Sequence, residues 1–208
     1  MIEVKGIYKR YKDDYLFENF SIAFPDGEVS VLIGPSGLGK TTLLRMIAGL
    51  EPYERGSITG VEQRRLSFVF QEDRLLPWLT AGDNIKLVLK AGMTEAEAND
   101  KTRQVLDLLH LSEAYGMMPS ELSGGMQRRL AIGRALAYDA EILLLDEPFK
   151  GMDEALKAEI LPKLAESWQT TGKTVILVTH DLAEAHNISR NIFELSGKPI
   201  TWSRCSSD

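Results

Sequence analysis

A short glycine-rich stretch of this chain could hold phosphate groups. It reads Gly34-Pro35-Ser36-Gly37-Leu38-Gly39-Lys40-Thr41-Thr42. Glycines let the main chain approach phosphate oxygens with its N–H groups turned inward. The Lys40 ammonium can reach β- and γ-phosphates, and the Thr41 hydroxyl can ligate Mg²⁺. The stretch lies between an apolar run, Val29–Ile33, and a helical pattern, Thr41–Leu50, which is the strand-to-helix setting that a phosphate cradle requires.

Two adjacent carboxylates, Asp146 and Glu147, follow a second apolar run, Ile142–Leu145. A buried strand that ends in a carboxylate places the charge at the carboxyl edge of a parallel sheet, where the cradle is also expected. Asp146 could therefore hold Mg²⁺ through water. Glu147 is the natural general base or water-orienting group for hydrolysis.

Two other polar residues follow apolar runs. His180 comes after Thr174–Val178, and Gln71 comes after Leu66–Phe70. Both are expected at the same sheet edge, with His180 within reach of a γ-phosphate and Gln71 in contact with Mg²⁺ or the attacking water. A histidine in that place without the other motifs would more often be structural.

The composition is that of a globular protein, with 44% hydrophobic and 26% charged residues in 208. The net charge of −6 argues against nucleic-acid binding, which needs a basic surface. No apolar run approaches the roughly 20 residues that cross a bilayer. Met1–Arg10 has no secretory apolar region, so we expect a cytoplasmic protein whose membrane role comes through a partner. The lone Cys205 cannot form an internal disulfide.

Strand-like and helical patterns alternate along most of the chain, which predicts an α/β fold with a mainly parallel sheet, as in P-loop NTPases. The apolar runs are short and continuous, as in strands buried on both faces. Glu154–Gln169 reads as a helix that Pro162 should kink or split. Near the N-terminus, Ile2–Ile7 and Phe20–Phe24 predict an antiparallel β-subdomain. The chain ends in a predicted hairpin, Asn191–Ser203.

Residues from about 80 to 137 read as helical. Asp83–Lys90 is apolar-periodic, and Thr94–Leu109 begins with Thr94 and Glu97 at the spacing of a capping box. This region is predicted to be a helical subdomain inserted into a single domain of 208 residues. The core and the β-subdomain then comprise 1–79 and 138–208.

A third motif, Leu122-Ser123-Gly124-Gly125-Met126-Gln127, has no use in a nucleotide site made by one chain. With it, the sequence resembles the ATP-binding subunits of ABC transporters over nearly its whole length, with the motifs in family order. The resemblance assigns Walker A to Gly34–Thr42, the Q-loop to Gln71, the signature to Ser123–Gln127, Walker B to Leu143–Glu147, the D-loop to Asp153 and the switch histidine to His180.

The family resemblance implies two subunits arranged head to tail, with ATP and Mg²⁺ between the cradle of one copy and the signature of the other. In that arrangement Ser123 offers a hydroxyl, Gly124 and Gly125 offer main-chain N–H groups, and Gln127 belongs to the same set. The helix that starts there directs its positive end at the γ-phosphate. A homodimer is expected, although the sequence leaves a heterodimer open. Outside the family setting, Ser-Gly-Gly could simply cap a helix.

Two further assignments follow from the resemblance. Tyr11 resembles the aromatic residue that stacks on adenine, with Tyr8 and Tyr15 as competitors. The run Phe149-Lys150-Gly151-Met152 replaces the usual Ser-Ala-Leu-like residues before Asp153 and could alter communication between the two sites.

The segment Gln71–Thr80 resembles the Q-loop region of importers for nitrate, sulfonates, taurine and related solutes. By resemblance, a groove there receives a coupling helix of the membrane permease, and the protein is peripheral at the cytoplasmic membrane face. An extracytoplasmic solute-binding protein would be an indirect partner. The groove residues are Leu75, Leu76, Pro77 and Trp78, which could alternatively pack one part of the chain onto another.

Two other functions remain open at this stage. An exporter or lipoprotein-release ATPase would use the same motifs. A soluble, non-transport ABC ATPase is the other class. By resemblance, the members that act in DNA repair or chromosome structure insert long coiled coils between the Q-loop and the signature. Here only about 50 residues separate Gln71 from Ser123, without sustained heptads.

Overall fold

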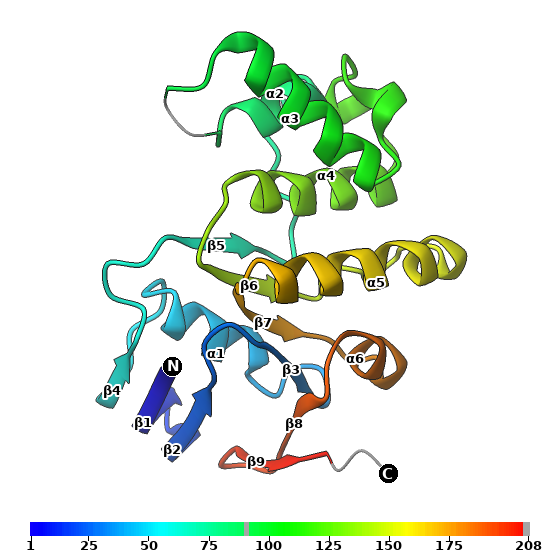
Figure 1. Cartoon of the computed structure of the whole chain (residues 1–208). Helices are drawn as coiled ribbons and strands as arrows, with labels where there is room; N and C mark the ends of the chain where they lie inside the picture. Colours follow the sequence, from blue (N-terminus) through cyan, green and yellow to red (C-terminus); the bar gives the residue numbers. More distant parts are fainter. Residues whose placement is uncertain (90–91, 206–208) are drawn as a thin grey trace. The chain divides into compact units, whose positions relative to one another are not determined.

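The structure, a computed structural model, describes residues 1–89 and 92–205 (Figure 1). The chain forms two compact units. The first comprises Met1–Phe68, Glu141–Glu147 and the described part of Leu161–Asp208. The second comprises Val69–Ala140 and Pro148–Ile160, and it contains the region of about 80–137 that the sequence predicts to be helical.

A six-stranded sheet forms the core of the first unit. The strands are ordered β5-β6-β7-β3-β8-β9. β6, β7, β3 and β8 run parallel, and β9 pairs antiparallel with β8 as the predicted terminal hairpin. Every residue of β3, β6 and β7 is buried, as the continuous apolar runs predict. The bounds are β3 Val29–Ile33, β5 Leu66–Val69, β6 Ile142–Asp146, β7 Thr174–Val178, β8 Asn191–Ser196 and β9 Thr201–Arg204.

A separate antiparallel sheet lies at the N-terminus, drawn in blue to cyan in Figure 1. It has the order β2-β1-β4, with β1 Ile2–Tyr11, β2 Asp14–Phe24 and β4 Arg55–Thr59. β1 and β2 are confirmed but extend beyond the predicted segments. β4 was not predicted from the sequence, because four of its five residues are exposed and it lacks an apolar face.

Three helices include residues of the first unit: α1 Lys40–Ile47, α5 Glu154–Thr170 and α6 Leu182–Ile188. Of the two predicted effects of Pro162, a kink or a split, the split is wrong, because one helix runs through the proline. Proline removes one helical N–H, but the buried side chains of Ile160, Leu164 and Trp168 on both sides of it stabilise the continuous helix.

The other helices belong to the second unit. They are α2 Ala81–Lys86, α3 Glu95–Leu108, the 3₁₀ turns Ser112–Ala114 and Pro119–Glu121, and α4 Gly124–Ala137. The predicted capping box is confirmed, because the Thr94 hydroxyl accepts from Glu97 N and the Glu97 carboxylate accepts from Thr94 N. The predicted helix at Asp83 begins at Ala81, and its predicted end at Lys90 lies outside the described residues.

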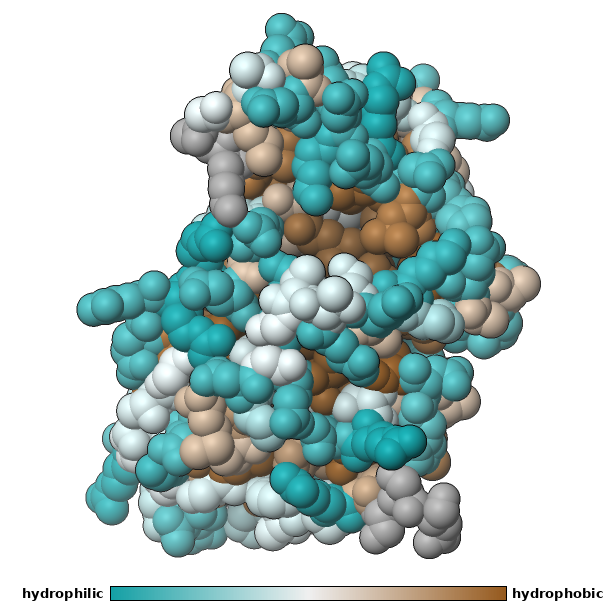
Figure 2. Space-filling view, viewed as in Figure 1, coloured by the Kyte–Doolittle hydropathy of each residue, from teal (hydrophilic) through white to brown (hydrophobic). Residues whose placement is uncertain are grey.

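One face of the molecule is mainly hydrophilic, with hydrophobic residues visible in separate patches (Figure 2). Among the described residues, no helix combines the length and the apolar character that spanning a membrane requires.

Candidate functional site

The glycine-rich stretch connects β3 to α1, as predicted. Gly34 and Gly39 have positive φ angles of 144° and 98°. A Cβ on Gly34 would lie 2.6 Å from the Leu195 carbonyl oxygen, and one on Gly39 would lie 2.9 Å from Leu16 Cδ2. Glycine is therefore required at both positions by backbone conformation and by packing. Leu38 differs from its neighbours, because its side chain is buried in the hydrophobic core of this unit.

Lys40 lies at the start of α1 and is only 6% exposed. Its ammonium donates to the carbonyl oxygens of Gly34, at 2.6 Å, and Pro35, at 2.9 Å. Burial lowers the pKa of Lys40, and the charges of Glu147 and Asp146 partly oppose that shift. The cradle lysine and the two Walker B carboxylates therefore form one electrostatic cluster within the first unit.

The two carboxylates lie at the end of β6, Asp146 within the strand and Glu147 directly after it, in different environments. Asp146 is the last residue of the strand and is buried. Glu147 has a φ of 50°, in the left-handed region that residues other than glycine rarely adopt, and its N–H donates to Val178 O at 2.9 Å. Its carboxylate oxygen Oε2 lies 2.8 Å from His180 Nδ1. The structure thus brings together Glu147 and His180, which the sequence predicts at one sheet edge.

The Glu147 side chain is 13% exposed, whereas that of His180 is 55% exposed. If Glu147 is ionised, it can only accept in this hydrogen bond, so the imidazole must carry a proton on Nδ1. His180 consequently fixes the direction of a carboxylate that is largely shielded from water.

A hollow of about 540 Å³ lies beside the cradle within the same unit. Tyr11, Tyr15 and Leu16 are among its lining residues, and Leu16 is the residue that packs against Gly39. The Tyr11 ring is half-exposed, its hydroxyl donates to Glu51 at 3.2 Å, and the Lys9 ammonium lies 4.9 Å from its centroid. Tyr8, the third tyrosine considered from the sequence, does not line this hollow.

The signature residues belong to the second unit. Ser123 is the N-cap of α4, and its hydroxyl accepts from Met126 N at 3.3 Å. Apart from chain neighbours and the nearby backbone of α4 itself, no atom of the described residues lies within 4 Å of a Cβ added to Gly124 or Gly125. The Gln127 amide instead donates inward, to the carbonyl oxygens of Pro119 and Leu122, which holds the turn before the helix.

Gln71 and Asp153 also belong to the second unit, and both are exposed. The Asp153 carboxylate accepts from the main-chain N–H groups of Ala155 and Leu156, so it caps the start of α5. Just before it, Gly151 has a φ of 76° and a side chain there would meet open space, while Phe149 and Met152 are buried.

The proposed docking segment has a defined internal structure. The buried Asn84 amide donates to the carbonyl oxygens of Leu76, Leu79 and Thr80, and its oxygen accepts from Leu76 N. This leaves Trp78 68% exposed.

Sequence reading missed Arg128, which contacts the main chain of Gln71. Its burial could have been predicted, though not its hydrogen-bond partners, because Arg128 falls on the same face of α4 as Ala131, Ile132 and Ala135, which are buried.

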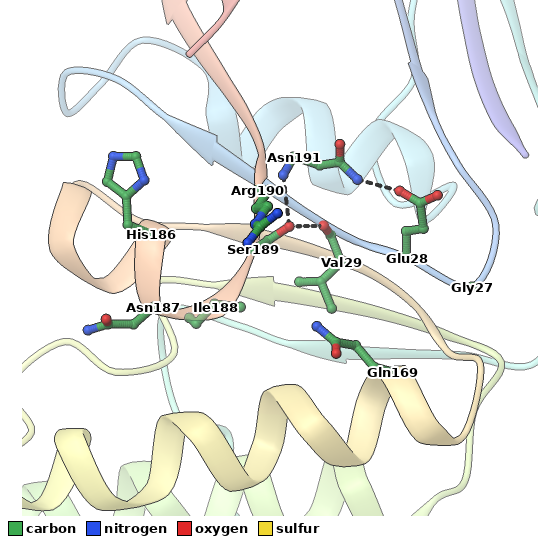
Figure 3. Close-up of a pocket in the computed structure, with 10 residues that line it drawn as sticks. All are labelled: Gly27, Glu28, Val29, Gln169, His186, Asn187, Ile188, Ser189, Arg190 and Asn191. Carbon is green, nitrogen blue, oxygen red and sulfur yellow. Dashed lines mark hydrogen bonds between the residues drawn. The ribbon is translucent and has the colours of Figure 1, made fainter. Parts of the chain in front are cut away.

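A pocket of about 410 Å³ lies elsewhere on the first unit (Figure 3). It is lined by Gly27, Glu28 and Val29 at the beginning of β3, whereas the cradle follows the end of the same strand. In Figure 3 the Ser189 hydroxyl donates to Val29 O, and the Asn191 amide donates to Glu28. No residue assigned to nucleotide binding from the sequence lines this pocket.

Comparisons with known proteins identify the family of this chain. The family model described as "ABC transporter" matches residues 17–150. The taurine import ATP-binding protein TauB of Escherichia coli (strain K12) is 37% identical over 206 residues, covering 96% of this chain and 81% of the relative. The aliphatic sulfonates import ATP-binding protein SsuB of Bacillus subtilis (strain 168) is 36% identical over 207 residues, covering 95% and 79%.

Solved structures give the same result. The dimeric structure of MJ0796, a bacterial ABC transporter cassette, superimposes with a TM-score of 0.85 at 31% identity, covering 93% of this chain and 94% of the other. A second dimeric structure of MJ0796, in a post-hydrolysis state bound to ADP and Pi, has the same TM-score at 30% identity. The chain therefore belongs to the ABC transporter family, as one of its ATP-binding and ATP-hydrolysing subunits.

Proposed function

We propose that this subunit hydrolyses ATP at two composite sites in a dimer and thereby drives import of a small solute of the sulfonate or taurine class. The observation that carries the catalytic part is the pairing of a shielded Glu147 with His180 at 2.8 Å, in the same unit as the phosphate cradle.

In the proposed reaction, the ammonium of Lys40 moves from the carbonyl oxygens of Gly34 and Pro35 to the β- and γ-phosphates, which are better acceptors because they are charged. Glu147 orients a water and takes its proton as the water oxygen bonds to the γ-phosphorus and the bond to the β-phosphate oxygen breaks. His180 holds the Glu147 carboxylate in place.

The donor set assigned to the metal is suited to Mg²⁺. Its residues are Thr41, Gln71 and Asp146, and all of them offer oxygen atoms. In the described chain no group of three or more His, Cys, Asp or Glu residues could hold a metal ion. Mg²⁺ is usually bound by one or two carboxylates together with substrate phosphates and waters. When bound, the ion neutralises charge on the phosphates.

The hollow beside the cradle is the proposed base site. Tyr11 and Tyr15 both line it, and Leu16 connects it to Gly39. Tyr11 is the better stacking platform, because its hydroxyl is anchored by Glu51 and its ring is half-exposed.

The signature is proposed to complete the site of a second copy. Ser123, Gly124 and Gly125 lie at a helix start with open space around the glycines, which allows close approach by a partner's nucleotide. Gln127 is proposed to support this surface by holding the preceding turn. Asp153, with the unusual run Phe149–Met152, is proposed to lie at the same interface. The dimeric relative MJ0796 supports a paired arrangement.

The membrane-facing surface is proposed to be the segment held by Asn84. Its residues Leu75, Leu76, Pro77 and Trp78 would receive a helix of the permease at the cytoplasmic membrane face, with the exposed Trp78 as the main contact. TauB and SsuB, by name, serve taurine and aliphatic sulfonate import, which favours import here over export. A solute-binding protein outside the membrane would deliver the solute.

Two experiments test the proposal. Purified protein should release phosphate from ATP in the presence of Mg²⁺, and chelation of Mg²⁺ should abolish release; turnover that persists with chelator would contradict it. Affinity purification of the native complex from membranes should recover a permease. Recovery of this subunit with no membrane protein would contradict the transport role while leaving the ATPase role intact.

A further inference from the structure

Arg128 links three segments of the second unit. It lies in the second turn of α4, and its side chain is 6% exposed. Its guanidinium Nε donates to Pro148 O at 3.1 Å, and Nη1 donates to Phe70 O at 2.6 Å and to Gln71 O at 2.9 Å. One side chain therefore connects the signature helix, the segment after β5 and the segment after β6.

The charge of this guanidinium is compensated locally. Nη1 also lies 3.0 Å from Asp73 Oδ1, and the Asp73 side chain is 25% exposed. A buried charge is costly unless it is paired and hydrogen-bonded. The planar guanidinium can bind several acceptors in fixed directions, which a flexible ammonium cannot do. The arrangement thus favours a geometric role over a purely stabilising one.

Two of the bound carbonyls belong to residues next to reactive groups. Gln71 carries the amide assigned to Mg²⁺ or the attacking water, and Pro148 directly follows Glu147 in the chain. We propose that Arg128 is a positioning residue for ATP hydrolysis, which holds the main chain at Gln71 and Pro148 in a fixed relation to the signature helix. The inference rests on the proposed function of Glu147.

Arg129 provides a matched control. It follows Arg128 on the same helix and also binds main-chain carbonyls, of Leu109 at 2.8 Å, of His110 at 3.0 Å and, within the same helix, of Gly125 at 3.4 Å. The Leu109 and His110 carbonyls lie between α3 and the next turn, and none of the three carbonyls belongs to Gln71 or Pro148. A loss of hydrogen bonds at Arg129 therefore tests stability without touching the proposed positioning.

The test compares steady-state hydrolysis by Arg128→Gln and Arg129→Gln. Arg128→Gln should lower kcat by about 10-fold to 10²-fold, because a small displacement of reacting groups has an effect of this size. Its KM for ATP should stay near that of the wild type, because the cradle is intact. Arg129→Gln should have the kcat of the wild type, with a melting temperature comparable to that of Arg128→Gln. If Arg128→Gln changes kcat no more than Arg129→Gln, the inference is wrong.

A double variant shows whether Arg128 acts through Glu147. In single-turnover assays, adding Arg128→Gln to Glu147→Gln should cause little further loss, whereas an unrelated structural defect would multiply the two losses. If Arg128→Gln does not fold, Arg128→Lys replaces it. Lysine keeps the positive charge beside Asp73, but it lacks the planar guanidinium that binds the carbonyl oxygens of Pro148 and Gln71 together. Equal rates for wild type and Glu147→Gln would instead refute the proposed function itself.

Discussion

The cradle region and the signature region differ in how far their functional residues are buried. Lys40, Asp146 and Glu147 are buried or nearly so, follow strands of one sheet and influence one another electrostatically. Ser123, Gly124 and Gly125 are solvent-accessible at a helix start, and the space beside the two glycines is open.

This difference indicates two kinds of constraint. The cradle carries a conformational and electrostatic cost for a preformed charged centre, as the left-handed Glu147 and the desolvated Lys40 indicate. Neither Gly124 nor Gly125 has a positive φ angle. In the proposal, the signature acts only when the nucleotide of a second copy approaches it. Substitutions in the two regions should therefore affect stability and turnover differently.

The largest loss of turnover is expected from Glu147→Gln. Removing the base should lower kcat by about 10²–10⁴-fold, because an amide cannot accept the proton of water. ATP binding should survive, so light scattering should detect an ATP-bound dimer. Near-normal phosphate release by this variant would remove Glu147 from its role.

Gly125→Asp should also lower turnover strongly, by at least about 10²-fold, because its negative side chain would keep the preorganised main-chain donors of the signature away from a developing negative charge. The added carboxylate would face the γ-phosphate of the partner's ATP. The folded chain has room for it, and an acid near a helix start is favourable, so the melting temperature should not fall. A destabilised variant, or one with wild-type kcat, would contradict the proposed exposed role.

His180→Ala should have a smaller effect, a decrease in kcat of about 10-fold to 10²-fold, because it frees the Glu147 carboxylate to rotate without removing it. The KM for ATP should change little. A loss as large as that of Glu147→Gln would indicate that His180 has a direct chemical role.

The smallest effect concerns stability. Lys40→Met, which also impairs turnover by damaging the cradle, should not lower the free energy of unfolding at pH 7, because it removes a desolvated charge. Since the pKa of Lys40 is lowered below 10.5, the folded state releases this proton before the unfolded state does. Wild type should therefore gain stability relative to Lys40→Met as the pH rises toward 10.5. Urea unfolding of both proteins at pH 7 and near pH 10.5 measures this difference. If wild type instead loses stability relative to Lys40→Met as the pH rises, burial does not lower the pKa of Lys40.

The sequence predicted the parts of the fold that have a strong local signal. Continuous apolar runs located β3 and β7 to the residue, and the Thr94–Glu97 pair located the start of α3. β4 was missed because its residues are mostly exposed, and the continuity of α5 through Pro162 depends on tertiary packing.

The candidate site was predictable where a motif carries its own chemistry. The contact of Glu147 with His180 follows from two strand ends at one sheet edge. The hydrogen bonds of Gln127 and Arg128 were not predictable, because their acceptors are main-chain carbonyls whose positions only the folded chain defines.

The central claim is that each catalytic centre combines the cradle of one copy with the signature of another. It is tested most directly by mixing Lys40→Met, which has a damaged cradle, with Gly125→Asp, which has a damaged signature. Each variant alone should be nearly inactive. Mixed dimers contain one intact pair, so phosphate release should reappear at roughly a quarter of the wild-type rate if subunits exchange freely and sites act independently. A mixture as inactive as its components, under conditions where mixed dimers are shown to form, would contradict the claim.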